Sequence, residues 1–517
     1  MPAIVKDSVY DWLAWYAEFD PQRLAAVDLA TRRRFSFGEL NDRATRLATA
    51  LRDGFGVEAG DRVAFLARNS TDHFESLFAC WKLGAIFVPL SWRLASPALL
   101  ALLRDADPRV VIHDRDFAGL LGAEPTARVE RRDGAADCPY ERLIAAHDAR
   151  VRMPDTQFDT TTMLIYTAGT TGRPKGVIYT HRMIHNITLH AALHARLRAH
   201  SRTLTFSPLF HSAGMNALTT PAFHYGGAVF VMREWDTEEC FALLTDPEVG
   251  ITHTVGVPTT YILLSQLPQF ETATFPSLEV AAVGAAPVPH HLLEAWDRRG
   301  LQLSQSYGLT EAFSVSFCPP ERAHEKLGSA GHALMHVEVR IGDPQGQEQP
   351  RGERGEIQVR GPGVTPGYWR NPQATAAAFT EDGWLRSGDV GLMTGDGTIF
   401  VIDRIKDMYI SGGENVYPAE IEDVIDSFDE VSQSAVVGVA DPRWGEVGSA
   451  FVQLREGQSL SEAQILQRCE ERLARFKVPR YLCLVARLPL SPQGKVLKHE
   501  LREMNAHARY WNAPVPL

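Results

Sequence analysis

Hydrophobic and polar positions follow two different periods along the first 290 residues. Apolar residues recur at helical spacing in some segments, and short apolar runs of strand length lie between these segments. Because strands that alternate with helices favour parallel sheets flanked by helices, we expect an α/β fold. The helical segments are 35–53, 73–84 and 96–106, and the strand-like runs are 61–67, 85–90, 109–114, 203–209, 227–232 and 278–287.

The pattern changes near Asp403. Two helical segments, 419–428 and 461–476, now alternate with longer strand-like runs. About 110 residues follow this point, which is enough for a small α+β domain. The roughly 400 residues before it are too many for one core and should hold more than one packed unit. The strand-like runs after Asp403 are 433–441, 448–456 and 481–490.

Composition and charge favour some classes of protein and argue against others. Of 517 residues, 45% are hydrophobic and 22% charged, as in soluble globular proteins, and the net charge of -11 argues against a nucleic-acid partner. The N-terminus lacks a signal-peptide pattern, and the most apolar stretch, 77–90, is too short to span a membrane. Six scattered cysteines without a CxxC pair suit reduced thiols, so we expect a cytoplasmic protein. Oligomeric state stays open, and a homo-oligomer is possible.

A glycine-rich stretch, YTAGTTGRPKG at 166–176, joins two apolar runs. Its glycines let the backbone approach an anion, while threonine hydroxyls and Lys175 offer donors and a positive charge, which favours a phosphate-binding loop. It is not a Walker A loop, because Pro174 precedes the lysine and Gly176 follows it. The alternative is a glycine-rich turn between two strands that binds nothing. We expect Thr180 to cap the helix that starts after this hairpin.

Four further motifs follow in order. They are YGLTE at 307–311, GWLRSGDVG at 383–391, IDRIKDMYISGGENVYPAEIE at 402–422 and SPQGKVLK at 491–498. Together with the glycine-rich stretch they resemble the adenylate-forming superfamily, which includes acyl-CoA synthetases, aryl-CoA ligases, luciferases and peptide-synthetase adenylation domains. The resemblance extends from about Phe35 to Arg502. It implies an N-terminal region, 1–403, with mixed and parallel sheets flanked by helices, a hinge at 404–406, and a mobile α+β lid domain at 407–517.

The resemblance also implies a nucleotide site. Phosphates would lie on the glycine-rich loop, adenine against Tyr307, and the ribose hydroxyls on Asp389, with Arg404 at ribose or phosphate and Mg²⁺ on Glu311. Each of these residues has an ordinary alternative role, such as a turn aspartate, a helix-start glutamate or a surface arginine. The implied ATP-binding residues are Thr167, Gly169, Thr170, Thr171, Gly172, Lys175, Gly284, Ala285, Ala286, Pro287, Tyr307, Gly308, Thr310, Asp389 and Arg404.

The same resemblance assigns the chemistry to the end of the chain. Lys495 would offset the charge that builds between the substrate carboxylate and the α-phosphate, and Lys406 occupies the hinge position. A rotation about that hinge would bring a CoA-binding surface to the site. The alternatives are a lysine in a solvated turn and, for Trp444, a packing aromatic. The implied CoA-binding residues are Gly412, Gly413, Trp444, Phe476 and Lys477.

The candidate acid pocket consists mainly of apolar or small residues. His211 would lie near the carboxylate, where a hydrogen-bonded loop histidine is the alternative. No aspartate lies in 208–217 to pair an α-ammonium group, and no lysine or arginine lies in 304–312 to pair a second carboxylate. The tail should therefore be aliphatic, alicyclic or aromatic, and we favour the first two. The pocket residues are His211, Gly214, Met215, Val257, Ala312 and Phe313.

The expected function is therefore ATP-dependent activation of a small-molecule carboxylic acid through an acyl adenylate, followed by thioester formation with CoA, with Mg²⁺ as cofactor. Lys495, Glu311 and His211 are the expected catalytic residues. Two alternatives remain. The acyl group could be loaded onto a carrier protein, or the chain could be a catalytically dead nucleotide-binding scaffold on the same fold.

Overall fold

The computed structural model describes residues 8–123, 126–167, 174–286, 288–319, 322, 326, 328–490 and 496–507. Within this part of the chain, residues 62–180 form a six-stranded sheet in the order β6-β5-β3-β4-β7-β8. All neighbours in it are parallel except β7 and β8, which form an antiparallel hairpin. The parallel α/β pattern expected for this region is confirmed. The strands are β3 (Arg62–Leu66), β4 (Ile86–Leu90), β5 (Val110–Asp114), β6 (Ala127–Arg131), β7 (Thr161–Thr167) and β8 (Lys175–Thr180).

A second sheet has nine strands in the order β15-β14-β13-β12-β11-β9-β10-β1-β2. Its centre, from β13 to β1, is parallel, and antiparallel strands complete both edges. The strands are β1 (Leu24–Asp28), β2 (Arg34–Ser36), β9 (Arg202–Thr205), β10 (Ala228–Val231), β11 (His253–Gly256), β12 (Val280–Gly284), β13 (Ser304–Tyr307), β14 (Ser316–Phe317) and β15 (His332–Ala333).

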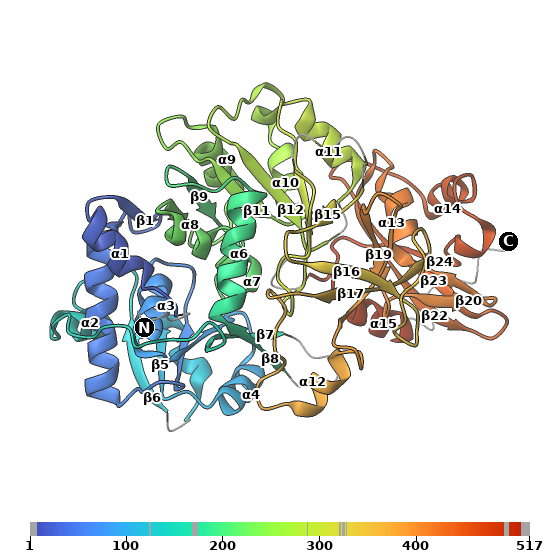
Figure 1. Ribbon diagram of the computed structural model, residues 1–517. Coiled ribbons are helices and arrows are strands. Elements are labelled where there is room, and N and C mark those ends of the chain that lie inside the picture. The colour runs from blue at the N-terminus through green and yellow to red at the C-terminus, as the bar shows by residue number, and fades with distance from the viewer. Residues whose placement is uncertain are drawn as a thin grey trace.

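One hydrophobic core joins these two sheets. Helices α2 (Phe37–Phe55), α3 (Asp72–Leu83), α6 (His181–Leu193) and α8 (Thr219–Tyr225) pack in it with strands of both sheets (Figure 1). The strands alternate as their period of two requires: Val63 and Phe65 of β3 enter this core, whereas Ala64 and Leu66 face α4 (Ser96–Ala106). Thr180 accepts a hydrogen bond from the Met183 N–H (3.3 Å), so its expected role as cap of α6 is confirmed.

Other helices cover the outer faces. Helices α9, α10 and α11 pack on the second sheet around Trp296 and Tyr261. The remaining helices of residues 8–403 are α1 (Trp12–Phe19), α5 (Pro139–Ala145), α7 (Ser212–Asn216), α9 (Thr237–Thr245), α10 (Pro258–Ser265), α11 (His290–Asp297) and α12 (Pro372–Ala378), and the short 3₁₀ turns are η1 (Arg115–Leu121) and η2 (Pro268–Thr272).

A third, antiparallel sheet separates these layers from the C-terminal elements (Figure 1). Its strands are β16 (Glu338–Gly342), β17 (Arg354–Arg360), β18 (Leu385–Met393) and β19 (Ile399–Arg404). It has a small core of its own, which includes Ile357, Val359 and Ile399. The expectation of more than one packed unit before Asp403 is met by these three sheets.

Residues 409–490 and 496–507, the described part of the C-terminal region, form a fourth sheet with three α-helices and a 3₁₀ turn. The helix expected at 461–476 is shorter than predicted: it starts with a capping box at Ser461 and ends at Glu470, and the chain then turns before η4. The elements are β20 (Tyr409–Ser411), β21 (Glu414–Val416), α13 (Pro418–Asp426), β22 (Val431–Asp441), β23 (Gly445–Leu454), α14 (Glu462–Glu470), η4 (Arg475–Lys477), β24 (Tyr481–Leu484) and α15 (Lys498–His507).

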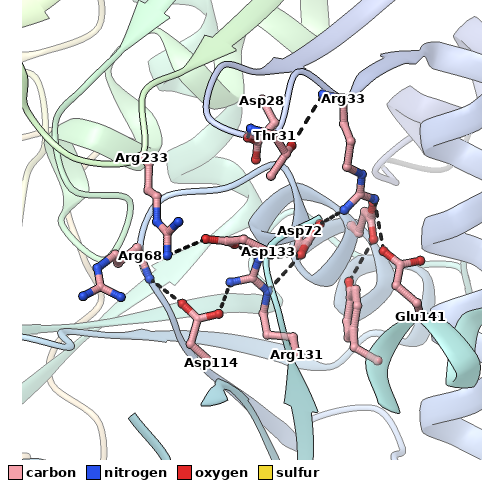
Figure 2. A network of polar contacts seen from close by, with 12 residues as sticks. Asp28, Thr31, Arg33, Arg68, Asp72, Asp114, Arg131, Asp133, Glu141 and Arg233 are labelled. Atoms are coloured by element: carbon pink, nitrogen blue, oxygen red, sulfur yellow. Dashed lines mark hydrogen bonds and ion pairs between the residues drawn. The ribbon is translucent and has the colours of Figure 1, made fainter. Parts of the chain in front are cut away.

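A buried ionic network ties the first sheet to the second (Figure 2). Arg131, at the end of β6 and 1% exposed, pairs with Asp72 of α3 (2.8 Å), with Asp114 and with Asp133. Arg233, which follows β10 of the second sheet, also pairs with Asp133 (2.8 Å). Charges that are so well buried are tolerated only when they are paired, so these residues fix how the two sheets meet.

Candidate active site

A cavity of about 1170 Å³ lies where the three N-terminal sheets meet the C-terminal elements. The carboxyl ends of β11, β12 and β13 open into it through Val257, Ala285 and Gly308. Ligands of parallel α/β sheets usually bind beyond the carboxyl ends of the strands. The cavity is therefore the candidate active site.

Small residues shape its wall after β12 and β13. A Cβ atom on Gly284 would lie 2.3 Å from the Ser306 carbonyl oxygen, and one on Gly308 would lie 1.6 Å from that of Phe313. Gly284, Ala285 and Ala286 all line the cavity, and Ala285 has a φ of 66°. Such a wall leaves room for a flat group to lie against the backbone. The sequence-predicted adenine wall therefore faces the cavity as far as the structure describes it.

Three of the predicted nucleotide residues contact one another. The Tyr307 hydroxyl donates to Asp389 Oδ2 (2.7 Å), and Arg404 Nε lies 3.2 Å from Asp389 Oδ1. Burial, reinforced by the Asp389 charge, raises the pKa of Tyr307 well above its ordinary value, so the phenol stays protonated and donates. β13 supplies the tyrosine, and the paired strands β18 and β19 supply the other two residues. Tyr307 and Arg404 line the cavity, whereas Asp389 does not line it and is bonded to both of them.

Glu356 positions this cluster, and no sequence motif indicates this role. Its Oε1 accepts from the Gly388 N–H (3.1 Å), and its Oε2 pairs with Arg386 (3.0 Å). These bonds hold the β18 backbone just before Asp389, where the pairing of β18 with β17 is irregular. Because 30 residues or more separate Glu356 from these partners along the chain, no local motif reveals the contact.

A second cluster surrounds Glu311. The Tyr368 hydroxyl donates to Glu311 Oε1 (2.8 Å), and Lys175 Nζ lies 5.0 Å from the centre of the Tyr368 ring. The Thr310 carbonyl accepts from the Tyr179 hydroxyl (2.6 Å). Tyr368 thus links the YGLTE motif to the lysine of the glycine-rich stretch. Sequence analysis missed Tyr368, for which the only signal was an aromatic residue after Gly367 in a turn-rich segment.

The glycine-rich stretch connects β7 to β8 as the two apolar runs suggested. Thr167 and Lys175, at its two ends, pair across the hairpin and line the cavity. Six of the predicted site residues lie outside the described part of the chain: Gly169, Thr170, Thr171, Gly172, Pro287 and Lys495.

The predicted acid pocket is only partly brought together. His211 lies at the start of α7, where its Nδ1 accepts from the Ala213 N–H (3.3 Å), and it lines the cavity with Val257 and Phe313. Gly214, Met215 and Ala312 do not line it: Met215 and Ala312 are buried in hydrophobic cores, and Gly214 packs on the Pro208 carbonyl. Sequence analysis missed the α6 residues that form the opposite wall, among them Ile187, His190 and Ala191.

The predicted hinge lies at the edge of the cavity. Arg404 ends β19, and the Asp407 N–H bonds back to the Arg404 carbonyl (3.0 Å), so Lys406 sits in a turn. Burial raises the pKa of the neighbouring Asp403 to about 6, although Lys498 acts in the opposite direction. Arg404 and Lys406 both line the cavity.

The start of α15 also reaches the cavity. Val496, Leu497 and Lys498 line it, and Lys498 Nζ pairs with Glu422 Oε1 of α13 (2.8 Å). Both side chains of this pair are at least 80% buried, at 15% and 17% exposure. The residues that directly follow Lys495 are therefore held at the site.

The predicted CoA residues lie elsewhere. Gly412 and Gly413 form the two-residue turn between β20 and β21, with φ of 61° and 91°, values that favour glycine. The Gly412 N–H donates to the Trp444 carbonyl (2.8 Å), and Trp444 and Phe476 are 43% and 41% exposed. Lys477 pairs with Glu420. None of these five residues lines the cavity in this structure.

Comparison with known proteins agrees with this geometry. A family model described as AMP-binding enzyme matches residues 13–369, and one described as AMP-binding enzyme C-terminal domain matches residues 420–495. Feruloyl-CoA synthase from Amycolatopsis sp. is 40% identical over 469 residues, which cover 90% of this chain and 93% of the relative. Indoleacetate–CoA ligase from Aromatoleum aromaticum is 37% identical over 513 residues, which cover 97% and 98%.

A solved structure shares the fold. The crystal structure of ATP-bound MatB from Rhodopseudomonas palustris has a TM-score of 0.88 at 30% identity, with 96% of this chain and 98% of that chain covered. Across the described ranges, no helix is long and apolar enough to cross a membrane. Because the two family models together span most of the sequence, the chain belongs to the AMP-binding, adenylate-forming family of acyl-CoA synthetases.

Proposed function

We propose that the protein joins an aromatic carboxylic acid with an uncharged tail to CoA through an acyl adenylate. The observation that carries this proposal is one cavity that is lined by Tyr307, by Arg404 and by a largely apolar wall from α6 and β11, with Asp389 bonded to the first two residues. The sequence favoured an aliphatic or alicyclic tail. The names of two relatives, feruloyl-CoA synthase and indoleacetate–CoA ligase, support an aromatic one.

The reaction needs two steps at one site. A carboxylate oxygen attacks the α-phosphorus of ATP, the bond to the bridging oxygen breaks, and pyrophosphate leaves. The CoA sulfur then attacks the acyl carbon, AMP leaves with the electron pair of the broken C–O bond, and the thiol proton passes to solvent. Because the first step brings two anions together, cations such as Lys175 and Arg404 beside the cavity favour it.

Glu311 fits a role as a single ligand of Mg²⁺. One of its oxygens accepts from Tyr368, and the residue lines the cavity. No group of three or more His, Cys, Asp or Glu side chains among the described residues could hold a metal. Magnesium would then take its other ligands from phosphate oxygens and water, as it commonly does in nucleotide sites. When bound, it would neutralise phosphate charge.

For CoA we propose a second orientation of residues 407–517. In the present arrangement Val496 to Lys498 face the cavity, whereas Trp444 and Phe476 are exposed to solvent. A rotation about residues 404–406 would exchange these two faces of the C-terminal region. Alternating domain orientations are a common way to use one site for two steps. Trp444, Phe476 and Lys477 would then receive the nucleotide part of CoA.

The test is pyrophosphate release by the purified protein over a panel of aromatic, alicyclic and aliphatic acids, with and without CoA. We expect release that depends on the acid and on magnesium, and a thioester product only when CoA is present. Adenylation without any thioester from free CoA would favour transfer to a carrier protein. A folded protein that binds ATP but releases no pyrophosphate with any acid would contradict the proposal and favour a scaffold.

Replacing Asp389 with asparagine should raise the KM for ATP. The variant keeps the shape of the side chain but loses the charge that we propose binds the ribose hydroxyls. Hydrogen bonds to charged groups contribute about 1.5–3 kcal/mol each, so kcat/KM for ATP should fall roughly 10- to 100-fold. Steady-state kinetics with ATP varied at saturating acid would measure it. The control is Asp396→Asn, in the turn between β18 and β19, which should leave the KM for ATP unchanged. An unchanged KM for ATP in Asp389→Asn would exclude the ribose role.

A further inference from the structure

The part of the cavity wall beside α6 contains two buried polar groups in largely apolar surroundings. Ile187 and Ala191 of α6 line this part together with Leu218 and Leu334. His190 of α6 and Ser316 of β14 also line it, and they are only 4% and 1% exposed. Neither residue has a role in the activation chemistry described above.

The hydrogen bonding of His190 fixes which of its nitrogens carries the proton. Its Nε2 lies 2.7 Å from the Met335 carbonyl oxygen, which can only accept, and 3.2 Å from the Asn186 side-chain amide nitrogen. The shorter contact assigns Nε2 as the donor to Met335. Burial lowers the pKa of His190 to about 4, which keeps the ring neutral near pH 7. Nδ1 is therefore an unprotonated acceptor. It is buried and has no hydrogen-bond partner in the described part of the chain.

Ser316 presents a similar case. Its Oγ is buried without a hydrogen-bond partner among the described residues. β14 pairs Ser316 with Ala333, and the Val315 carbonyl accepts from the Leu334 N–H (3.0 Å). The segment from Ala333 to Met335 thus contacts both Ser316 and His190. A buried polar atom without a partner destabilises a fold, and two of them in one cavity wall indicate a ligand that would bond them.

We propose that His190 and Ser316 recognise a hydrogen-bond donor on the ring of the acid, such as a phenolic O–H or a ring N–H. This inference rests on the proposed function, because it specifies the acid that the cavity accepts. A ring packed against α6 would fill the apolar wall, and its donor would meet the Nδ1 lone pair and the Ser316 hydroxyl. An analogue whose donor is methylated would leave both groups unpaired. A site built to bond a substrate hydroxyl rejects the analogue that lacks it far more strongly than an apolar pocket does.

The test compares matched acids that differ only in the donor. The pairs are 4-hydroxycinnamate with 4-methoxycinnamate, and indole-3-acetate with 1-methylindole-3-acetate. We expect the wild-type protein to prefer the donor-bearing acid of at least one pair by tenfold or more in kcat/KM for pyrophosphate release. In His190→Phe the preference should fall to within about threefold of unity, mainly through the KM for the acid, while the KM for ATP stays unchanged. Ser316→Ala should reduce the preference by a smaller factor.

One control variant and the activity of the wild-type protein separate this inference from the function on which it depends. His200→Phe makes the same change at an exposed residue outside the cavity wall and should keep the wild-type preference. If the wild-type protein activates no acid at all, the proposed function fails. If it activates both acids of each pair equally, or if folded His190→Phe keeps the preference, water satisfies these groups and the inference is overturned. Should His190→Phe not fold, an unchanged preference in Ser316→Ala overturns it in the same way.

Discussion

Lys495→Ala is expected to lower the rate of adenylate formation by about 10²- to 10³-fold, while thioester formation from supplied acyl adenylate stays close to that of the wild type. Groups that stabilise charge in a transition state typically contribute this much, and only the first step adds negative charge at the α-phosphate. The role of Lys495 comes from the sequence resemblance. It is supported by the residues that follow, because Val496, Leu497 and Lys498 line the cavity and Lys498 is tied to Glu422.

The measurement separates the two steps. Exchange of labelled pyrophosphate into ATP reports adenylation, and consumption of chemically prepared acyl adenylate with CoA reports the second step. Lys326→Ala is the control, since this lysine pairs with Asp396 and lies outside the cavity wall. Equal losses in both steps would mean that Lys495 supports the fold of the lid or binds the adenylate, and would refute the assigned role.

Arg131→Met should have the largest effect on stability. The change leaves Asp72 and Asp114 buried without their shared cation, and loss of one partner from a buried ion pair commonly costs about 3–5 kcal/mol. Because the entropy of unfolding scales with the roughly 400 residues before the hinge, a loss of this size would lower the midpoint of thermal unfolding by about 4–6 °C. Differential scanning calorimetry or fluorescence would record the shift.

Arg132→Met is the matched control for this change. It removes the neighbouring arginine, which pairs at the surface with Glu130 and is 42% exposed. Surface pairs contribute about 0–1 kcal/mol, so its midpoint should stay close to that of the wild type. Similar shifts in the two variants would show that the Arg131 network does not hold the sheets together.

Local patterns were sufficient for most of the fold. The run around Val63 and Phe65 reads as a buried strand because both of its faces meet apolar cores, and Thr180 marks a helix start because its side chain bonds the first turn. The end of α14 could not be read in the same way. The sequence continues with residues that suit a helix beyond Glu470, but tertiary packing turns the chain there.

Only the site residues that belong to a recognisable sequence motif could be predicted. Tyr307, Asp389 and Arg404 were expected to serve one nucleotide, and the structure brings them into contact. Glu356 and Tyr368 act through partners that are 30 or more residues away, so their neighbours in sequence do not reveal them. The sequence also did not determine which residues at a short helix face the cavity. His211, the N-cap of α7, lines the cavity, whereas Met215 of α7 lies in the core. This difference depends on how α7 packs and not on its composition.

The two hydrophobic cores of the C-terminal region are separate from those of the N-terminal region, and this separation determines the free-energy cost of rotating the C-terminal region. The cores around Ile421 and Phe451 contain only residues from 409 to 501, so a swing about the hinge need not open either of them. The contacts to be broken include polar ones such as Arg354–Glu420, whose arginine is half exposed. Such contacts are weak and are screened by salt. The equilibrium between the two proposed orientations of the C-terminal region should therefore depend on ionic strength more than on temperature.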